Sequence, residues 1–126
     1  MKNYIPQGKD DIKYALYLKE LPFEAVSGDV SELLIWLQDL HWDAAQGVVE
    51  YLRPYVNEIK VELIKVLSDN DAEWKLGVMT LISRSTNKLD QEIITALKHI
   101  INHPTKEDQE QELDEVAKDI IARYSA

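Results

Sequence analysis

Residues 33–52, LLIWLQDLHWDAAQGVVEYL, are followed by residues 63–82, LIKVLSDNDAEWKLGVMTLI, which repeat their pattern at a shift of about 30 residues. Aliphatic residues fall on aliphatic residues, acidic residues on acidic residues, and Gly47 falls on Gly77. A weaker third copy begins at Ile93 and needs an insertion of about nine residues, 103–111, before its second half matches. Repeats of this length with two helices each are typical of α-solenoids of the HEAT or armadillo type.

Apolar residues recur at spacings of three and four along almost the whole chain, which indicates amphipathic helices and no strands. One helix is predicted from about Asp10 to Glu20, and the apolar residues expected to face the core are Ile12, Ala15, Leu16 and Tyr17. The breaks between helices are short, so neighbouring helices should be antiparallel. The sequence therefore predicts one all-α domain over residues 1–126, a short HEAT-like α-solenoid of antiparallel helical hairpins with about seven or eight helices.

An irregular helical bundle is the alternative fold, because it would show the same helical period. The glycines favour the solenoid. Gly47 and Gly77 each lie inside a predicted helix, where a glycine costs about 0.5–1 kcal/mol relative to alanine. Their equivalent places beside the apolar stripe predict that neighbouring helices approach closely there.

The chain is acidic, with 14 basic and 23 acidic residues and a formal net charge of -9. Such a surface repels phosphate backbones and anionic lipid headgroups, so neither nucleic acid nor a membrane is an expected partner. A basic protein or peptide is favoured by the sign of the charge. The same charge is also explained by solubility alone, and the composition does not separate the two interpretations.

Several chemistries lack their usual residues. The chain has no cysteine, so disulfides and thiolate metal sites are excluded, and a reducing compartment fits. The amino terminus does not resemble a signal peptide and no stretch is apolar enough to cross a bilayer, which predicts a cytoplasmic protein. Glycine-rich phosphate loops, G-x-S-x-G and H-E-x-x-H are missing, so we expect neither an enzyme nor a bound cofactor.

A set of short motifs is spread over nearly the whole chain: Ile5-Pro6, LIWLQDLHW at residues 34–42, Asp71 with Trp74-Lys75, Pro104, and LDEVAKDI at residues 113–120. In these motifs the chain resembles a family of small bacterial domains catalogued as domain of unknown function 5071. The resemblance implies an all-helical, HEAT-like fold. It implies no established activity and assigns no functional residues.

The turns within successive hairpins should meet at one edge of the stack, about 10 Å apart. That edge would collect His41, Asp43 and Asp71, whose imidazole and carboxylate groups suit a ligand or a divalent metal. The competing interpretation is that the acidic residues are helix caps and turn formers, which need Asp for backbone reasons.

Tryptophans and the last helix offer further candidate binding residues. Trp36 lies off the apolar stripe of its helix, so it either packs against the amino-terminal helices or is exposed as a binding anchor. Trp42, in a turn, is expected to be the most accessible tryptophan, whereas Trp74 should pack between repeats. Glu112 and Glu115 belong to an acidic stretch that either steers a basic partner or solvates the end of the stack.

Three functions remain open from the sequence. The first is an interaction module for a protein or peptide, for example an immunity-type protein that blocks a basic nuclease toxin. The second is a small-molecule or metal-dependent enzyme that uses His41, Asp43 and Asp71 at the turn edge. The third is a structural adaptor that docks through its amino-terminal helices and exposes an apolar patch around Trp36.

Overall fold

The computed structural model describes residues 2–124, and these residues form helices without any strand. Three 3₁₀ segments continue neighbouring α-helices, and counting each continuous run once gives eight helices over residues 2–124, as predicted. The elements are α1 (Tyr14–Leu18), α2 (Phe23–Val26), η1 (Ser27–Asp29), α3 (Val30–Leu34), η2 (Ile35–Leu37), α4 (Asp43–Leu52), η3 (Arg53–Tyr55), α5 (Lys60–Leu67), α6 (Ala72–Ser83), α7 (Gln91–Asn102), α8 (Lys106–Glu110) and α9 (Leu113–Tyr124).

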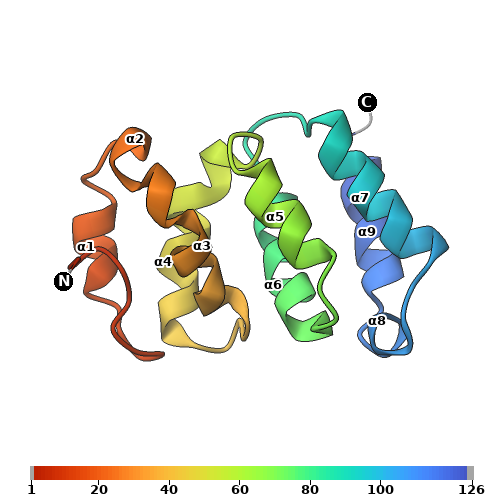
Figure 1. Ribbon diagram of the computed structural model, residues 1–126, viewed down its shortest axis with the longest axis horizontal. Coiled ribbons are helices and arrows are strands. Elements are labelled where there is room, and N and C mark those ends of the chain that lie inside the picture. The colour runs from red at the N-terminus through yellow and green to blue at the C-terminus, as the bar shows by residue number, and fades with distance from the viewer. Residues whose placement is uncertain (1, 125–126) are drawn as a thin grey trace.

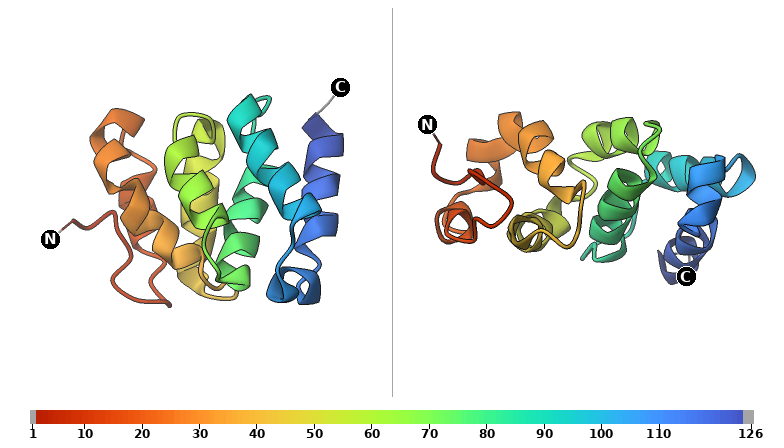
Figure 2. Two further views of the ribbon diagram at one scale, coloured as in Figure 1. Left: turned by 45° about the vertical axis from the view of Figure 1, so that its right-hand side comes forward. Right: turned by 90° about the horizontal axis from the view of Figure 1, so that it is seen from below.

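The helices stand side by side in a row of hairpins (Figure 1). Seen from below, they form two layers: α2–α3, α5 and α7 in one layer, and α1, α4, α6 and α9 in the other (Figure 2). Hydrogen bonds join groups one repeat apart. The Tyr14 hydroxyl donates to the Ala44 carbonyl, and the Tyr51 hydroxyl donates to the Leu21 carbonyl at 2.8 Å, each across 30 residues of chain. The repeat seen in the sequence is therefore a repeat of helix packing.

One continuous core runs between the layers, from Tyr4 to Ile120. Gly47 and Gly77 both lie where a neighbouring helix approaches closely, α1 at Gly47 and η2 at Gly77. A methyl group on Gly77 would stand 1.9 Å from the Leu37 carbonyl oxygen, and one on Gly47 would stand 2.5 Å from the Tyr14 hydroxyl. The close approach predicted from the two glycines is confirmed.

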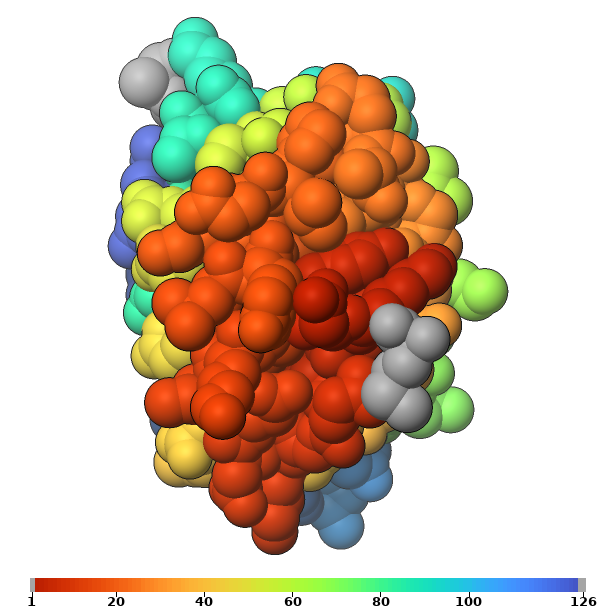
Figure 3. All heavy atoms as spheres, turned by 90° about the vertical axis from the view of Figure 1, so that its left-hand side faces the viewer, coloured from red at the N-terminus to blue at the C-terminus, as the bar shows by residue number. Residues whose placement is uncertain are grey.

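The prediction for the first helix was wrong in its length and in its buried face. Helix α1 spans only Tyr14–Leu18, because the Asp11 carboxylate accepts hydrogen bonds from the backbone N–H groups of Lys13 and Tyr14 and starts the helix there. Tyr14 and Leu18 are the buried residues. Ile12, Leu16 and Tyr17 are 66%, 58% and 51% exposed. Helix α1 lies at one end of the row of helices, on the face that Figure 3 shows.

The capping predictions for the turns were partly right. Asp71 is the N-cap of α6, and its carboxylate accepts from the Trp74 N–H at 3.1 Å. Thr105 and Asp108 form a reciprocal capping box at the start of α8. Asp43 is not a cap: Trp42 holds the N-cap position, and Asp43 is the first helical residue of α4. At this position Asp43 still interacts favourably with the positive end of the helix dipole.

Replacing Glu112 by glycine is expected to raise the free energy of unfolding by about 0.5–1 kcal/mol. Glu112 follows the C-cap of α8 with φ of 56°, in the left-handed region that glycine adopts without a steric penalty. Urea unfolding followed by circular dichroism measures the change. Glu112→Gln keeps the Cβ atom and removes only the charge, so equal stabilisation by both variants would contradict the conformational explanation.

Candidate binding surface at the turn edge

The turns within the hairpins, residues 38–43, 68–73 and 103–112, lie along one edge of the stack, at the bottom of Figure 1. We call this surface the turn edge. It carries a group of exposed carboxylates: Asp43, Asp69, Asp71, Glu73, Glu107, Glu110 and Glu112. The same three segments contain one lysine, Lys106, and no arginine. The turn edge is therefore strongly acidic.

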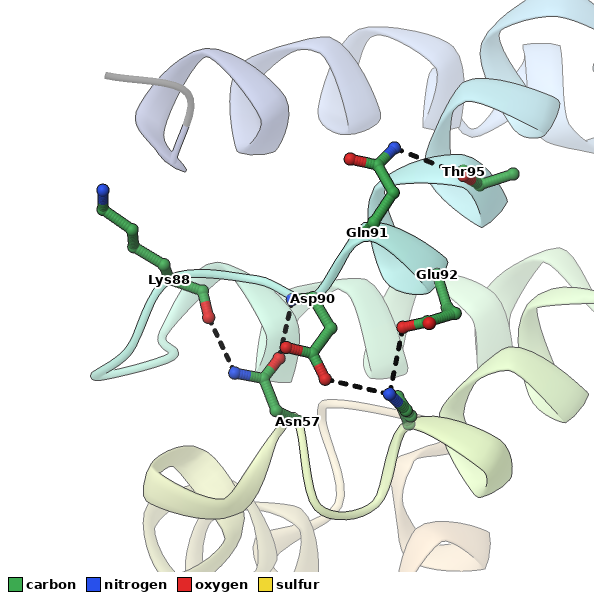
Figure 4. A network of polar contacts seen from close by, with 7 residues as sticks. Asn57, Lys88, Asp90, Gln91, Glu92 and Thr95 are labelled. Carbon is green, nitrogen blue, oxygen red and sulfur yellow. Dashed lines mark hydrogen bonds and ion pairs between the residues drawn. The ribbon is translucent and has the colours of Figure 1, made fainter.

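The opposite edge, made by the loops between hairpins, mixes both charges and pairs them. Lys60 Nζ lies 3.0 Å from both Asp90 Oδ2 and Glu92 Oε2 (Figure 4), and the hydrogen bond from Lys60 lowers the pKa of the Glu92 carboxyl. Asn57 joins the same loops, since it donates to the Lys88 carbonyl and accepts from the Asp90 N–H. The acidic excess of the chain is thus gathered on one edge.

The three predicted ligand residues do not form a ligand group. His41 is exposed, and its Nδ1 lies 3.1 Å from Asp39 Oδ1, while the His41 backbone N–H donates to the same carboxylate and lowers the pKa of Asp39. Asp71 is engaged as a cap, and Asp43 is exposed at the start of α4. Within residues 2–124, no three or more His, Cys, Asp or Glu side chains are arranged to hold a metal ion.

Two of the tryptophans form an aromatic pair at this edge. The rings of Trp36 and Trp42 are both half-buried and meet edge to face, with centroids 5.9 Å apart. Trp42 is thus less accessible than its place in a turn suggested. Trp74 packs between repeats as predicted, and its Nε1 donates to the Leu34 carbonyl at 2.9 Å.

The two glutamates of the last hairpin differ in setting. Glu112 is exposed in the link between α8 and α9, and its carbonyl accepts from the backbone N–H groups of Glu115 and Val116. Glu115 is exposed on α9, 3.8 Å from Lys118. An exposed pair at this distance contributes little to stability, so the Glu115 carboxylate remains accessible to a partner.

A buried ion pair lies directly behind the turn edge, and the sequence analysis missed it. Lys75 Nζ donates to Asp108 Oδ1 at 2.9 Å, and the two side chains are 4% and 2% exposed. The available signal was the position of Lys75 on the buried stripe of α6, three residues after Ala72 and three before Val78. A lysine at such a position needs a buried partner.

The adaptor hypothesis placed an exposed apolar patch around Trp36. The exposed large apolar residues of the described chain are Ile12, Leu16, Tyr17, Ile35 and Val61. Three of the five belong to α1 or the residues just before it, and only Ile35 is next to Trp36. Most of the exposed large apolar residues are therefore at the first helix, and the half-buried Trp36 ring packs against Trp42.

Among the described helices, none is both long enough and apolar enough to cross a membrane. No curated protein matches the chain. The sequence profile of a family described as "Domain of unknown function (DUF5071)" matches residues 4–121, which cover all the helices up to α9. The chain belongs to the DUF5071 family.

Proposed function

We propose that this protein is a cytoplasmic interaction module, built on HEAT-like repeats, that binds a basic protein or peptide through its acidic turn edge. The observation that carries the proposal is the segregation of charge. The three turn segments carry seven exposed carboxylates against Lys106, with Lys9 beside them through its contact with Ala44, whereas charges at the opposite edge are paired. A surface of one sign attracts a partner of the other sign and raises its association rate.

Helix stability alone explains only part of this acidity. Asp43, Glu73 and Glu107 lie in the first turns of α4, α6 and α8, where the helix dipole favours a carboxylate. Glu110 is the last residue of α8, where the dipole disfavours one. An acidic residue at an unfavourable helix end supports a role for the charge outside the fold.

The Trp36–Trp42 pair supplies the apolar part of the surface. Half-buried aromatic rings lose little side-chain entropy on binding, and tryptophan is enriched among residues that dominate binding energy. A basic partner could therefore be attracted by the carboxylates and held by the rings. An immunity-type protein that neutralises a basic toxin is one concrete form of this function.

The test compares two variants with equal loss of negative charge. The turn-edge variant carries Asp43→Asn, Glu107→Gln, Glu110→Gln and Glu112→Gln. The control variant carries Glu20→Gln, Glu24→Gln, Glu58→Gln and Asp119→Asn, which are exposed outside the turn edge. In pull-downs from the source organism at low and moderate salt, wild type and control should retain one basic protein. The turn-edge variant should lose it by about tenfold or more.

Mass spectrometry identifies the retained proteins, and titration of the purified partner gives the affinity of each variant. Moderate salt should release the partner from wild type, because exposed charges are screened over about 8–10 Å at these ionic strengths. Recovery of no basic protein at low salt, or equal recovery by the two variants, would show that the turn edge is not the binding surface.

A further inference from the structure

Two apolar grooves flank α5. They belong to the layer formed by α3, α5 and α7, whose helices Figure 2 shows side by side. The α3–α5 groove has a volume of about 230 Å³; Leu34, Ile35, Val66 and Trp74 form its apolar lining, with Glu62 and Asp69 at its rim. The α5–α7 groove has a volume of about 360 Å³; Ile64, Leu67 and Ala96 line it, with Glu92, Thr95 and His99 at its rim.

The sequence repeat makes the two grooves equivalent. Four lining residues of the α3–α5 groove have a counterpart 30 residues later that lines the α5–α7 groove. The pairs are Leu34 and Ile64, Glu62 and Glu92, Val66 and Ala96, and Asp69 and His99. The second groove therefore offers a ligand an apolar floor and a glutamate similar to those of the first. Repeated grooves of this kind suit a chain that crosses the layer.

Charge separates this layer from the other one. The two grooves beside α5 are lined by three carboxylates, Glu62, Asp69 and Glu92, and by one lysine, Lys65. Lys60 pairs with Glu92, which leaves Glu62 and Asp69 as the carboxylates that attract a basic segment. The grooves of the α1–α4–α6 layer are lined by two basic residues, Lys19 and Arg84, and by one carboxylate, Glu50. A basic segment is therefore favoured beside α5 and disfavoured on the opposite layer. Asp69 also belongs to the turn edge, so the α3–α5 groove continues the acidic surface.

Helix spacing sets the spacing of the anchoring side chains. Neighbouring packed helices are about 8–10 Å apart. A peptide in the polyproline II conformation advances about 3.1 Å per residue with three residues per turn, so its side chains at positions i and i+3 lie on one face, about 9 Å apart. Such a pair of side chains matches the spacing of the two grooves. Ala96 in the α5–α7 groove takes the place of Val66 in the α3–α5 groove, so the two apolar floors differ at this position.

We propose that the α3–α5–α7 layer binds a basic peptide segment in the polyproline II conformation, which inserts two apolar side chains three residues apart into the two grooves. This inference rests on the proposed function and specifies the binding surface and the chemistry of the partner segment. Lysine or arginine residues beside the anchors face Glu62 and Asp69, because Glu92 is already paired with Lys60 at 3.0 Å.

The probe is a phage-displayed library of random peptides, followed by a fluorescently labelled synthetic copy of the most enriched sequence. We expect enriched peptides to be basic and to carry two apolar residues three positions apart. Ile35→Ser removes apolar lining from the α3–α5 groove, and Ala96→Gln fills the α5–α7 groove with an amide; each should weaken binding about tenfold or more.

Val61→Ser is the matched control, because Val61 is a 73%-exposed apolar residue of α5 that lines neither groove. It should leave the affinity unchanged. The groove variants alter no charge, so the salt dependence of peptide binding should remain that of wild type. Unchanged binding by Ile35→Ser and Ala96→Gln, or an equal loss with Val61→Ser, would overturn the groove assignment.

The outcomes also separate this inference from the proposed function. The enriched basic peptides could bind the groove variants as tightly as wild type but bind the turn-edge variant more weakly. This result would support the proposed function and show that the grooves are not the binding site. Enrichment of peptides without basic residues would refute both the basic partner and the basic segment.

Discussion

Replacing Lys75 by methionine is expected to lower the free energy of unfolding by about 3–5 kcal/mol, because it leaves the buried Asp108 carboxylate without its cation. Asp108 is 2% exposed at its side chain, so water does not replace the lost ammonium group. The Thr105 backbone N–H still donates to Asp108, which keeps the penalty below that of an isolated buried charge.

Urea unfolding of the full chain at neutral pH, followed by circular dichroism, measures this loss. Lys118→Met is the matched control, because the Lys118 ammonium lies 3.8 Å from Glu115 on an exposed face, and its loss should cost less than about 1 kcal/mol. In the double variant Lys75→Met/Asp108→Leu neither side chain carries a buried charge, so much of the lost free energy of unfolding should be recovered. About 1 kcal/mol should remain lost, because Asp108 no longer caps α8. A loss of under about 1 kcal/mol in Lys75→Met would refute this account of the ion pair.

The effect of Lys75→Met should also depend on pH. Burial by itself raises the pKa of the Asp108 carboxyl, but the hydrogen bonds from Lys75 and Thr105 outweigh burial and hold this pKa below its usual 3.8. A lowered folded-state pKa stabilises the protein above the unfolded value, and this contribution is lost as pH falls through the folded value. In Lys75→Met burial is no longer opposed by the ammonium group and raises the pKa of Asp108, so protonation of this carboxyl relieves the penalty already above its usual value. The stability difference between wild type and Lys75→Met should therefore shrink progressively as the pH falls from neutral to about 3. A constant difference from neutral pH to about pH 3 would contradict the assignment.

The fold was largely predictable from the sequence because its repeat and helical period are local patterns. The prediction failed at α1, where the exposed Ile12, Leu16 and Tyr17 looked as apolar as a buried stripe. A helix at the end of a stack is covered on one side only, and periodicity does not tell which side. Tyr14 is buried there because its hydroxyl reaches the Ala44 carbonyl, a contact 30 residues away in the chain.

The candidate surface was predictable to the extent that it depends on topology. Turns within antiparallel hairpins must share an edge, which is why Asp43, Asp71 and Glu112 lie together on the turn edge. The Lys75–Asp108 pair was not predictable in the same way. It joins α6 to a capping residue in the 103–111 insertion, which has no counterpart in the other repeats to indicate where it packs.

Replacing Gly77 by alanine is expected to lower the free energy of unfolding by about 3 kcal/mol or more, by overpacking the contact between α6 and η2. The added Cβ atom would lie 1.9 Å from the Leu37 carbonyl oxygen, which is backbone and cannot move by changing a rotamer. Alanine favours the helix by about 0.5–1 kcal/mol, which is too little to offset such a contact.

Two other glycines calibrate this effect. Gly47→Ala would bring its methyl group 2.5 Å from the buried Tyr14 hydroxyl and 2.9 Å from the Ala15 Cβ atom. Both contacts are longer than the 1.9 Å contact at Gly77, so the loss should be smaller than at Gly77. Gly28 has no atom within 4 Å of its Cβ direction, so Gly28→Ala should be neutral or slightly stabilising. Thermal and urea unfolding of the three variants should rank them with Gly77→Ala least stable and Gly28→Ala most stable. If Gly77→Ala were as stable as Gly28→Ala, α6 and η2 would have to be farther apart than the 1.9 Å between the added Cβ atom and the Leu37 carbonyl oxygen implies. The glycine repeat would then not determine how the hairpins stack.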